Sequence, residues 1–421
     1  MFPLTSFEQG SFTLITGPVK SEKTTILEAI LNSAKDGGLM EKEPFLVVKH
    51  PNDDLKQPDH IGRHAAHSLQ NPDEIARLLK EEHRHVIIGG ISHYDSKNIV
   101  DLVDGLVRSN RNVVASGLNL NTSGMPYKHM SGLMSLTDDV VLTKGICDDN
   151  GCFREDAVRS VELEEGVFAP RCLHHFNYPG SPGTTPDRDG GIVVFAGPMF
   201  ASKSVKWSSI VSRKKVANVP YVTLTWIDNT RYGTNAGSRS VFDEGVASLN
   251  NGKKISAVLV RNADDVVEYL KMKPCVRDVF IDEVMLLDND YVNDKVDKSV
   301  LSVLNEYSAR GYRFYLTGLH RNFKREPFFE MPKLMCVATH IEMSNAYCVV
   351  CSHPSTENQR MKWVAKGKYV PARYDDHIVA TGGAKEMNDE PPQCYEARCL
   401  EHFELPGAPD VKYKFPKWSL I

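Results

Sequence analysis

The sequence predicts two α/β domains of the same fold in tandem, each with a parallel sheet and a small metal-binding knuckle. Three observations carry this prediction: an internal repeat, a glycine loop between a strand and a helix in each repeat, and a cysteine–histidine cluster near the end of each repeat. A length of 421 residues suits two or three domains. With 41% hydrophobic and 25% charged residues the chain is globular in composition, which excludes global disorder.

The repeat is defined by segments that recur in the same order. Residues 11–24 (SFTLITGPVKSEKT) match residues 191–204 (GIVVFAGPMFASKS), and residues 171–176 (RCLHHF) match residues 398–403 (RCLEHF). Between these segments, three further pairs share one offset: Gly117 and Gly318, Pro126 and Pro327, and Cys147 and Cys348. So many matches in one order indicate two homologous copies.

These matches divide the chain into copy 1, residues 1–177, and copy 2, residues 191–421. Residues 178–190 (YPGSPGTTPDRDG) are rich in Pro, Gly and Thr, which is typical of a linker. Short apolar runs that alternate with helical segments predict parallel strands. The clearest runs are Phe45–Lys49, Val86–Ile88, Val113–Ser116, Ile192–Ala196, Val222–Thr225, Val279–Ile281 and Phe314–Thr317.

Charge and hydropathy narrow the function classes. A formal net charge of -4 argues against bulk electrostatic attraction to nucleic acid, although a local basic patch stays compatible with it. No run approaches the roughly 20 apolar residues that span a bilayer, so we expect no membrane association. Residues 1–10 lack a basic region and an apolar core, so we expect no secretory signal and a cytoplasmic location.

Copy 2 carries most of a P-loop, the pattern Gly-x-x-x-x-Gly-Lys-Ser/Thr between a strand and a helix. Its backbone N–H groups point at phosphate, its Lys meets the terminal phosphates and its hydroxyl meets Mg²⁺. Gly197, Lys203 and Ser204 fit the pattern, and Ser202 stands where the second Gly belongs. A Ser at this position leaves the backbone of the loop less conformational freedom than a Gly would. The alternative interpretation is a degenerate P-loop that is retained only because the fold needs it.

The next central strand of copy 2 ends in two carboxylates, Asp282 and Glu283. P-loop enzymes need an acidic residue there for the Mg²⁺ shell, and a second carboxylate often accepts the substrate proton. Copy 1 has Gly89 and Gly90 at the aligned place, and its loop, with Gly17, Lys23 and Thr24, has Glu22 in place of the second Gly. We therefore expect copy 1 to be inactive.

Each copy also carries cysteines and a histidine at spacings that suit tetrahedral Zn²⁺, which prefers thiolate and imidazole ligands. Four protein ligands leave no open position for water, so both predicted sites are structural. His174 and His353 are alternative ligands, and Cys275, Cys336 and Cys394 are expected to be packed. The predicted ligand sets are Cys147, Cys152, Cys172 and His175 in copy 1, and Cys348, Cys351, Cys399 and His402 in copy 2.

Together these residues resemble the type II thymidine kinases, the zinc-containing P-loop deoxynucleoside kinases. The resemblance covers nearly all of copy 2 and, more weakly, most of copy 1. Its motifs in copy 2 are the loop GPMFASKS at residues 197–204, DNTRYG at 228–233, the Asp-Glu strand end, GLH…F…PF at 318–328, and GGA at 382–384 followed by Tyr395. Copy 2 departs from the family at Ser202, at Val284–Leu287, at His320 and in the longer stretch 357–376.

The resemblance implies the role of each residue in copy 2. Lys203 would stabilise charge on the transferring phosphoryl group, Ser204 and Asp282 would hold Mg²⁺, and Glu283 would take the proton of the nucleoside 5′-hydroxyl. A zinc-tethered lasso would close over the base. The implied MgATP-binding residues are Gly197, Ser202, Lys203, Ser204, Asp228 and Arg231; the implied nucleoside-binding residues are Phe323, Gly382, Gly383 and Tyr395.

Two functions of different classes remain open at this point. Copy 2 is either a kinase for a deoxynucleoside, with copy 1 as a structural partner, or a dead kinase fold that binds a protein or a nucleic acid. Family members assemble from like subunits, so the fused pair is expected to imitate a dimer or to self-associate. For nucleic acid the relevant cations near the loop would be Lys203, Lys206, Arg213, Lys214 and Lys215.

Overall fold

The computed structural model divides the chain into two compact units. Unit 1 comprises residues 1–176 together with residues 410–421, and unit 2 comprises residues 177–409. The segment after Pro409 thus packs with unit 1, although it follows copy 2 in the sequence. The structure describes residues 9–53, 57–149, 151–177, 189–228, 240–248, 254–288, 299–365, 368–378 and 394–418.

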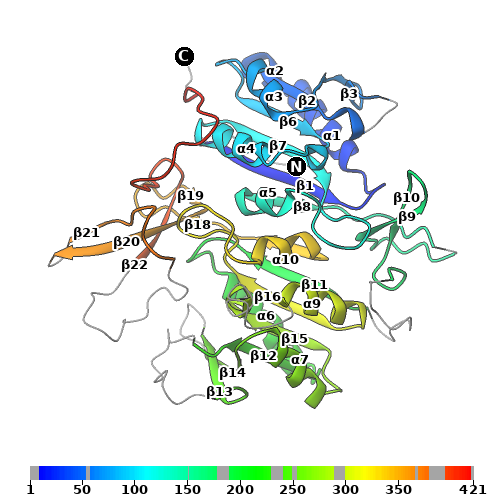
Figure 1. Cartoon of the computed structure of the whole chain (residues 1–421), viewed down its shortest axis with the longest axis vertical. Coiled ribbons are helices and arrows are strands. Elements are labelled where there is room, and N and C mark those ends of the chain that lie inside the picture. Colours follow the sequence, from blue (N-terminus) through cyan, green and yellow to red (C-terminus); the bar gives the residue numbers. More distant parts are fainter. Residues whose placement is uncertain are drawn as a thin grey trace. The chain divides into compact units, whose positions relative to one another are not determined.

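Unit 1 alternates strands and helices along the chain (Figure 1). Its elements are β1 (Ser11–Gly17), α1 (Lys23–Asp36), α2 (Leu39–Lys42), β2 (Phe45–Lys49), η1 (Pro51–Asp53), β3 (His60–Ile61), β4 (His64–Ala65), β5 (His67–Ser68), α3 (Pro72–Leu78), β6 (His85–Gly89), η2 (Ile91–His93), α4 (Asn98–Arg108), β7 (Asn112–Leu118), α5 (Met130–Leu136), β8 (Asp139–Leu142), β9 (Arg159–Glu164) and β10 (Val167–Arg171).

The main sheet of unit 1 has six strands in the order β5-β2-β6-β7-β1-β8, all parallel. Its central strands are apolar because both faces of the sheet are covered. Ile87 of β6 packs with Leu27 and Leu31 of α1. Val86 and Ile88, which point to the other face, are also fully buried.

Unit 2 repeats this alternation. Its elements are β11 (Gly191–Ala196), α6 (Lys203–Val216), β12 (Tyr221–Trp226), β13 (Glu244–Ser248), β14 (Lys254–Val260), α7 (Ala263–Met272), β15 (Asp278–Asp282), η4 (Val284–Asp288), α9 (Val300–Ala309), β16 (Arg313–Gly318), α10 (Met331–Val337), β17 (His340–Met343), β18 (Ala346–Tyr347), β19 (Pro354–Ser355), β20 (Glu357–Ala365), β21 (Lys368–Pro371) and β22 (Cys394–Arg398).

The main sheet of unit 2 has the order β13-β14-β12-β15-β16-β11-β17. Its strands are parallel except for β13, which pairs antiparallel with β14 and forms an edge that the parallel prediction did not include. The core on one face is aromatic: Trp207 of α6 meets Phe280 edge-on, and Phe280 stacks on Tyr315. All seven strands predicted from apolar runs are present.

The two sheets share one topology. In unit 1, β1 lies between β7 and β8, and in unit 2, β11 lies between β16 and β17. β1 therefore corresponds to β11, β7 to β16 and β6 to β15. Lys49 pairs with Gly89 and Thr225 pairs with Asp282, so Gly89 and Asp282 hold equivalent register positions. The loops after β1 and β6, and after β11 and β15, open at the carboxyl edge, where ligands of such sheets bind.

Each unit adds small β elements after its main sheet. In unit 1 these are the antiparallel pair β9 and β10. In unit 2, β20 pairs antiparallel with both β21 and β22, and the stretch 357–376 that is longer than usual forms β20, β21 and the turn after them. Within the described ranges, no helix has both the length and the apolar character that a membrane crossing requires.

Candidate nucleotide site and metal centres

The loop between β11 and α6 wraps back on itself in unit 2. Gly197 has φ +145°, and a Cβ on it would lie 2.1 Å from the carbonyl oxygen of Ser344, so only glycine fits there. The Met199 N–H donates to Oδ1 of Asn358 at 2.7 Å, which fastens the loop to β20. The Lys203 side chain is buried and its Nζ donates to the carbonyl oxygen of Pro198 at 2.5 Å.

Ser202 adopts a left-handed conformation, which glycine reaches more easily than other residues. It is the N-cap of α6 with φ 56° and ψ 20°, and Phe200 in the same loop also has a positive φ of 66°. A left-handed conformation at a residue with a Cβ costs on the order of 1 kcal/mol. The replacement therefore strains the loop without preventing its shape, and the side chain of Ser202 points to solvent.

The two carboxylates of unit 2 follow directly at the end of β15. Asp282 is 5% exposed and accepts a hydrogen bond from Oγ1 of Thr317 at 2.5 Å, across the neighbouring strand β16. The Glu283 N–H donates to the same Oγ1 at 3.3 Å. Glu283 has φ 51°, so the chain turns sharply at the residue that the sequence singles out as the base.

Unit 1 builds the same loop with other side chains. Glu22 is the N-cap of α1 with φ 62° and ψ 19°, which matches Ser202 closely. Nζ of Lys23 donates to the carbonyl oxygen of Pro18, as Lys203 does to Pro198. Burial lowers the pKa of Lys23 to about 8, and the nearby Asp53 opposes this shift.

At the end of β6 in unit 1, other residues fill the space that corresponds to the side chains of Asp282 and Glu283 in unit 2. A Cβ on Gly90 would lie 2.5 Å from Cβ of Asp53, and a Cβ on Gly89 would lie 3.1 Å from Cγ of Lys49. Gly90 keeps φ +68°, close to the 51° of Glu283. The backbone of the site is therefore preserved, and Lys49 at the end of β2 and Asp53 in η1 lie where side chains on Gly89 and Gly90 would be.

The residues expected to hold the nucleoside, and two of those expected to bind MgATP, Asp228 and Arg231, lie partly within the described chain. Phe323 is 3% exposed, with the guanidinium of Arg360 5.1 Å from its ring centroid. Tyr395 lies on β22 opposite Arg360 of β20, and Asp228 is exposed just after β12. Arg231, Tyr232, Gly382, Gly383 and Ala384 lie outside the described residues.

A buried ionic group ties β20 to the loop after β16. The Glu357 side chain is 2% exposed, with Nη1 of Arg321 3.3 Å from its Oε1 and Nη1 of Arg325 in closer contact with the same oxygen. A buried carboxylate is tolerated where cations and hydrogen bonds surround it. This group fixes β20, and with it Asn358, which holds the Gly197–Ser204 loop.

The two predicted ligand sets each come together. Within each set of three cysteines and one histidine, the donor atoms lie within 4.8 Å of one another: Cys147, Cys152, Cys172 and His175 in unit 1, and Cys348, Cys351, Cys399 and His402 in unit 2. His174 and His353 belong to neither set, so the alternative ligands are not needed.

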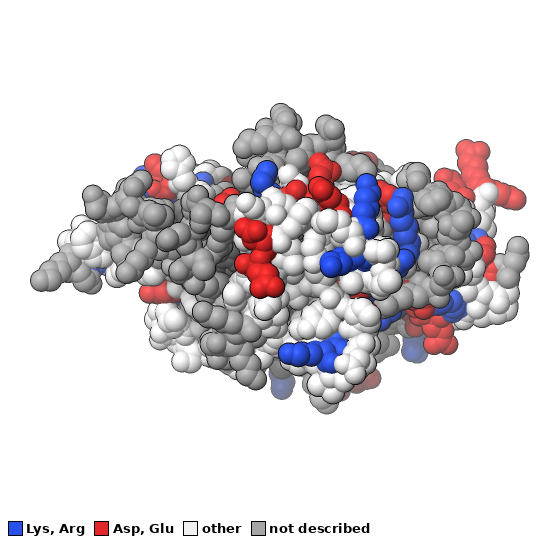
Figure 2. Space-filling model, turned by 90° about the horizontal axis from the view of Figure 1, so that it is seen from below, with Lys and Arg blue, Asp and Glu red and all other residues white. Residues whose placement is uncertain are grey.

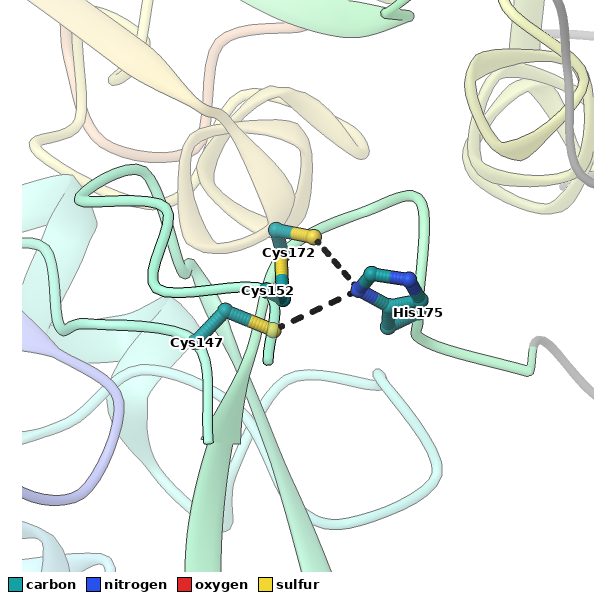
Figure 3. A group of neighbouring side chains, drawn as sticks. All are labelled: Cys147, Cys152, Cys172 and His175. Atoms are coloured by element: carbon teal, nitrogen blue, oxygen red, sulfur yellow. Dashed lines mark hydrogen bonds between the residues drawn. The ribbon is translucent and has the colours of Figure 1, made fainter. Parts of the chain in front are cut away.

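The distances within the clusters suit zinc. A tetrahedral Zn²⁺ with Zn–S of about 2.3 Å and Zn–N of about 2.05 Å sets S–N edges near 3.6 Å and S–S edges near 3.8 Å. In unit 1, Nδ1 of His175 lies 3.6 Å from Sγ of Cys147 and 3.4 Å from Sγ of Cys172 (Figure 3). In unit 2, Sγ of Cys351 and Sγ of Cys399 are 3.6 Å apart.

The surroundings of the unit 1 cluster also fit a metal centre. Nε2 of His175, which faces away from the sulfurs, lies 3.6 Å from Oδ2 of Asp149, the kind of carboxylate that orients a ligating histidine. Burial raises the pKa of the Cys172 thiol to about 12, so a bound cation would have to displace its proton. The other cysteines differ: Cys336 is buried as expected, Cys394 is half-buried, and Cys275 is exposed, so its expected packing is wrong.

The basic residues of α6 do not form a phosphate-binding cluster at the loop. Lys206 pairs with Glu342 at 2.6 Å, and Lys214 pairs with the fully buried Asp278 at 3.1 Å. Lys214 lies about 17 Å along the helix from its first residue, so the basic group at the end of α6 is remote from the loop before the helix. Cations at a helix C-terminus are favourable without any ligand. On the face in Figure 2, basic and acidic side chains are interspersed.

Sequence reasoning missed three residues of these sites. Thr317 holds Asp282, Asn358 holds the loop, and Asp53 fills the space above Gly90. A hydroxyl one residue before the repeated Gly-Leu pair was a usable signal for Thr317. Asn358 and Asp53 depend on how distant segments pack, which their sequence neighbourhood does not reveal.

Comparison with protein families identifies the class. Two segments of the chain, residues 10–167 and residues 190–403, match the thymidine kinase family. The chain therefore belongs to this family, and it carries the family's fold as two tandem copies.

Proposed function

We propose that copy 2 is an ATP-dependent deoxynucleoside kinase, that copy 1 is its inactive structural partner, and that the protein works in the cytoplasm. The observation that carries the proposal is the pairing, on one sheet edge, of the Gly197–Ser204 loop with the Asp282–Glu283 strand end. Asp282 is held by Thr317 at 2.5 Å, so the acid group is oriented before any ligand binds.

The residues of copy 2 have distinct roles in this proposal. Backbone N–H groups of the loop and the N-terminus of α6 hold the phosphates of ATP, and the Lys203 ammonium moves from the Pro198 carbonyl to the transferring phosphoryl group. Ser204 and Asp282 would hold Mg²⁺, which supplies charge neutralisation at the phosphates when bound.

Glu283 acts on the acceptor. Its carboxylate takes the proton of the 5′-hydroxyl, the 5′-oxygen forms a bond to the γ-phosphorus, and the bond from that phosphorus to the β–γ bridging oxygen breaks, releasing ADP. Phe323, Tyr395 and the Gly382–Gly383 segment are proposed to enclose the base. Asp228 and Arg231 are proposed to complete the phosphate side.

Copy 1 is proposed as a partner without catalysis. The loss of both strand-end carboxylates, and the filling of their space by Asp53 and Lys49, support this role. We further propose that the two copies imitate a family dimer within one chain. The binding-module alternative has less support, because Lys206 and Lys214 are engaged by carboxylates of unit 2.

The test is phosphate transfer from MgATP to a panel of deoxynucleosides, followed as labelled nucleoside monophosphate. We expect product with the wild-type chain, and loss of about 10² to 10⁴-fold in rate with Glu283→Gln, the range for removal of a general base. Glu22→Gln, in the loop of copy 1, is the matched control and should keep full activity. A folded, zinc-loaded protein that makes no product with any nucleoside would overturn the proposal.

A further inference from the structure

The last segment of the chain lies against unit 1, where it makes specific contacts. The Tyr413 hydroxyl donates to Oδ1 of Asp73, in the first turn of α3, and Nζ of Lys412 reaches the same oxygen at 3.1 Å. Tyr413 is 7% exposed. Figure 1 shows this segment in red beside the helices of unit 1.

Two arginines of unit 1 receive the rest of the segment. Nη1 of Arg111 donates to the carbonyl oxygen of Pro416 at 2.9 Å, and the guanidinium lies 5.8 Å from the ring centroid of Phe415. Arg84 lies 4.5 Å from the ring centroid of Trp418. Both arginine side chains are almost fully buried, so the aromatic rings contribute to their cover.

The backbone of the segment also docks. The Trp418 N–H donates to the carbonyl oxygen of Ser109 at 2.9 Å, just after α4. Within α4, a Cβ on Gly105 would lie 2.4 Å from the Tyr413 carbonyl oxygen, so this approach requires glycine in the middle of a helix. Glycine there costs roughly 1 kcal/mol relative to alanine, so it needs a packing reason, and the Tyr413 backbone supplies one.

Unit 2 provides an internal comparison, because the equivalent surface is closed by its own side chains. Glu306 stands at the place of Gly105 and pairs with Arg310 at 2.5 Å. Tyr312 stands at the place of Arg111, with Arg277 4.5 Å from its ring centroid and donating to its hydroxyl at 2.8 Å. Gly105 and Arg111 are thus specific to copy 1, whereas Arg84 has a counterpart in Arg277, which packs on Tyr312 instead.

The segment begins close to the metal cluster of unit 2. His402 is the last cluster residue, and the next residues are fastened to unit 2: the Glu404 N–H donates to Oε1 of Gln359 at 2.8 Å, and the Tyr374 N–H donates to the carbonyl oxygen of Pro406 at 2.9 Å. Only a few residues separate these contacts from Asp410, where unit 1 begins again.

We propose that copy 1 carries a docking site for the chain's own C-terminal segment, residues 410–418. The site consists of Asp73, Arg84, Gly105, Ser109 and Arg111. Its ligand is an extended peptide with aromatic residues at 413, 415 and 418 and a lysine at 412. This gives copy 1 a purpose that needs no catalysis, and the inference holds whether or not copy 2 transfers phosphate.

The test is hydrogen exchange of the full chain, with the residue from copy 2 introduced into copy 1. Gly105→Glu places a side chain where Tyr413 must pass, and we expect the Trp418 amide to exchange about tenfold faster or more, which corresponds to about 1.4 kcal/mol of lost docking free energy. The amides of β7 should not change. Glu306→Gly is the matched control and should leave the segment protected.

Tyr413→Phe is a milder second variant that removes only the hydroxyl bound to Asp73, and it should give a smaller acceleration of the same amides. A Trp418 amide that exchanges in Gly105→Glu as it does in the wild type would overturn the docking site. Protection that is lost on dilution would show that the bound segment comes from a second copy, against the proposal.

Discussion

At the carboxyl edge of their sheets, copy 1 and copy 2 have nearly the same backbone conformation but different side chains. The loop N-caps Glu22 and Ser202 both lie near φ 60°, and the turn residues Gly90 and Glu283 lie at 68° and 51°. Both loop lysines donate to the carbonyl oxygen of a proline. The geometry of a phosphate loop is therefore kept in both copies, and it does not by itself indicate activity.

The difference lies in the groups above that backbone. In unit 2, Thr317 orients Asp282. In unit 1, Gly89 holds the position of Asp282. Lys49 at the end of β2 and Asp53 in η1 occupy the space that acid side chains would need. The comparison teaches that copy 1 lacks the two carboxylates and also the space for them, so we expect that restoring single residues would not make it active.

The largest expected effect separates the two loop lysines. Lys203→Met should lower the rate of phosphate transfer by about 10² to 10³-fold, because a cation aimed at the transferring group is lost. Lys23→Met, the same change in copy 1, should leave the rate unchanged. Steady-state kinetics of the two variants measure this, and equal losses would contradict the assignment of catalysis to copy 2.

The metal clusters should behave alike in the two copies. We expect about two zinc ions per chain by elemental analysis, and one in either Cys172→Ser or Cys399→Ser, because each cysteine belongs to a separate cluster. Each variant should also unfold at a lower temperature, since metal binding contributes to folding free energy. Cys275→Ser, at an exposed cysteine outside both clusters, should keep both ions. Loss of both ions in one variant would show that the clusters are not independent.

Lys23 should make the stability of copy 1 depend on pH. Its pKa is lowered to about 8 by burial, so between about pH 8 and 10.5 the unfolded chain binds more protons than the folded one. Stability should therefore rise with pH across this window, by up to roughly 3 kcal/mol. Urea unfolding of wild type and Lys23→Met at several pH values isolates this contribution. A rise of the same size in the variant would exclude Lys23 as its cause.

Gly90→Glu tests whether the space above Gly90 in copy 1 is filled, and the expected change in stability is smaller. The new side chain would collide with Asp53 and adopt a positive φ, so we expect a destabilisation of about 2 kcal/mol and no gain in phosphate transfer. The reverse change, Glu283→Gly, puts glycine at a positive φ that it adopts without strain, so it should not destabilise unit 2 to the same degree. A Gly90→Glu variant as stable as the wild type would show that the space is open.

Much of the architecture could be predicted because it depends on local patterns. Short β-branched runs predicted the strands, and the loop pattern marked the start of α1 and α6. Cysteine spacing predicted both clusters, since ligands with two to four residues between them can converge on one ion. The edge strand β13 was missed because its antiparallel pairing depends on β14, and the exposure of Cys275 because it lies in a turn before β15.

What sequence could not predict depends on contacts between distant segments. Asp53 lies far from Gly90 along the chain, and no spacing rule connects them. Residues 410–418 follow copy 2 and were assigned to it by position, yet their aromatic side chains pack on Arg84 and Arg111 of unit 1. The internal repeat helped only where both copies keep the same residue, and these contacts are found in copy 1 alone.

The stoichiometry of MgATP binding tests the central claim most directly, that copy 2 alone is a working nucleotide site. Isothermal titration calorimetry with a non-hydrolysable ATP analogue and Mg²⁺ should give one site per chain, abolished by Lys203→Met and retained in Lys23→Met. Two sites per chain, or one site that survives Lys203→Met and disappears with Lys23→Met, would contradict it.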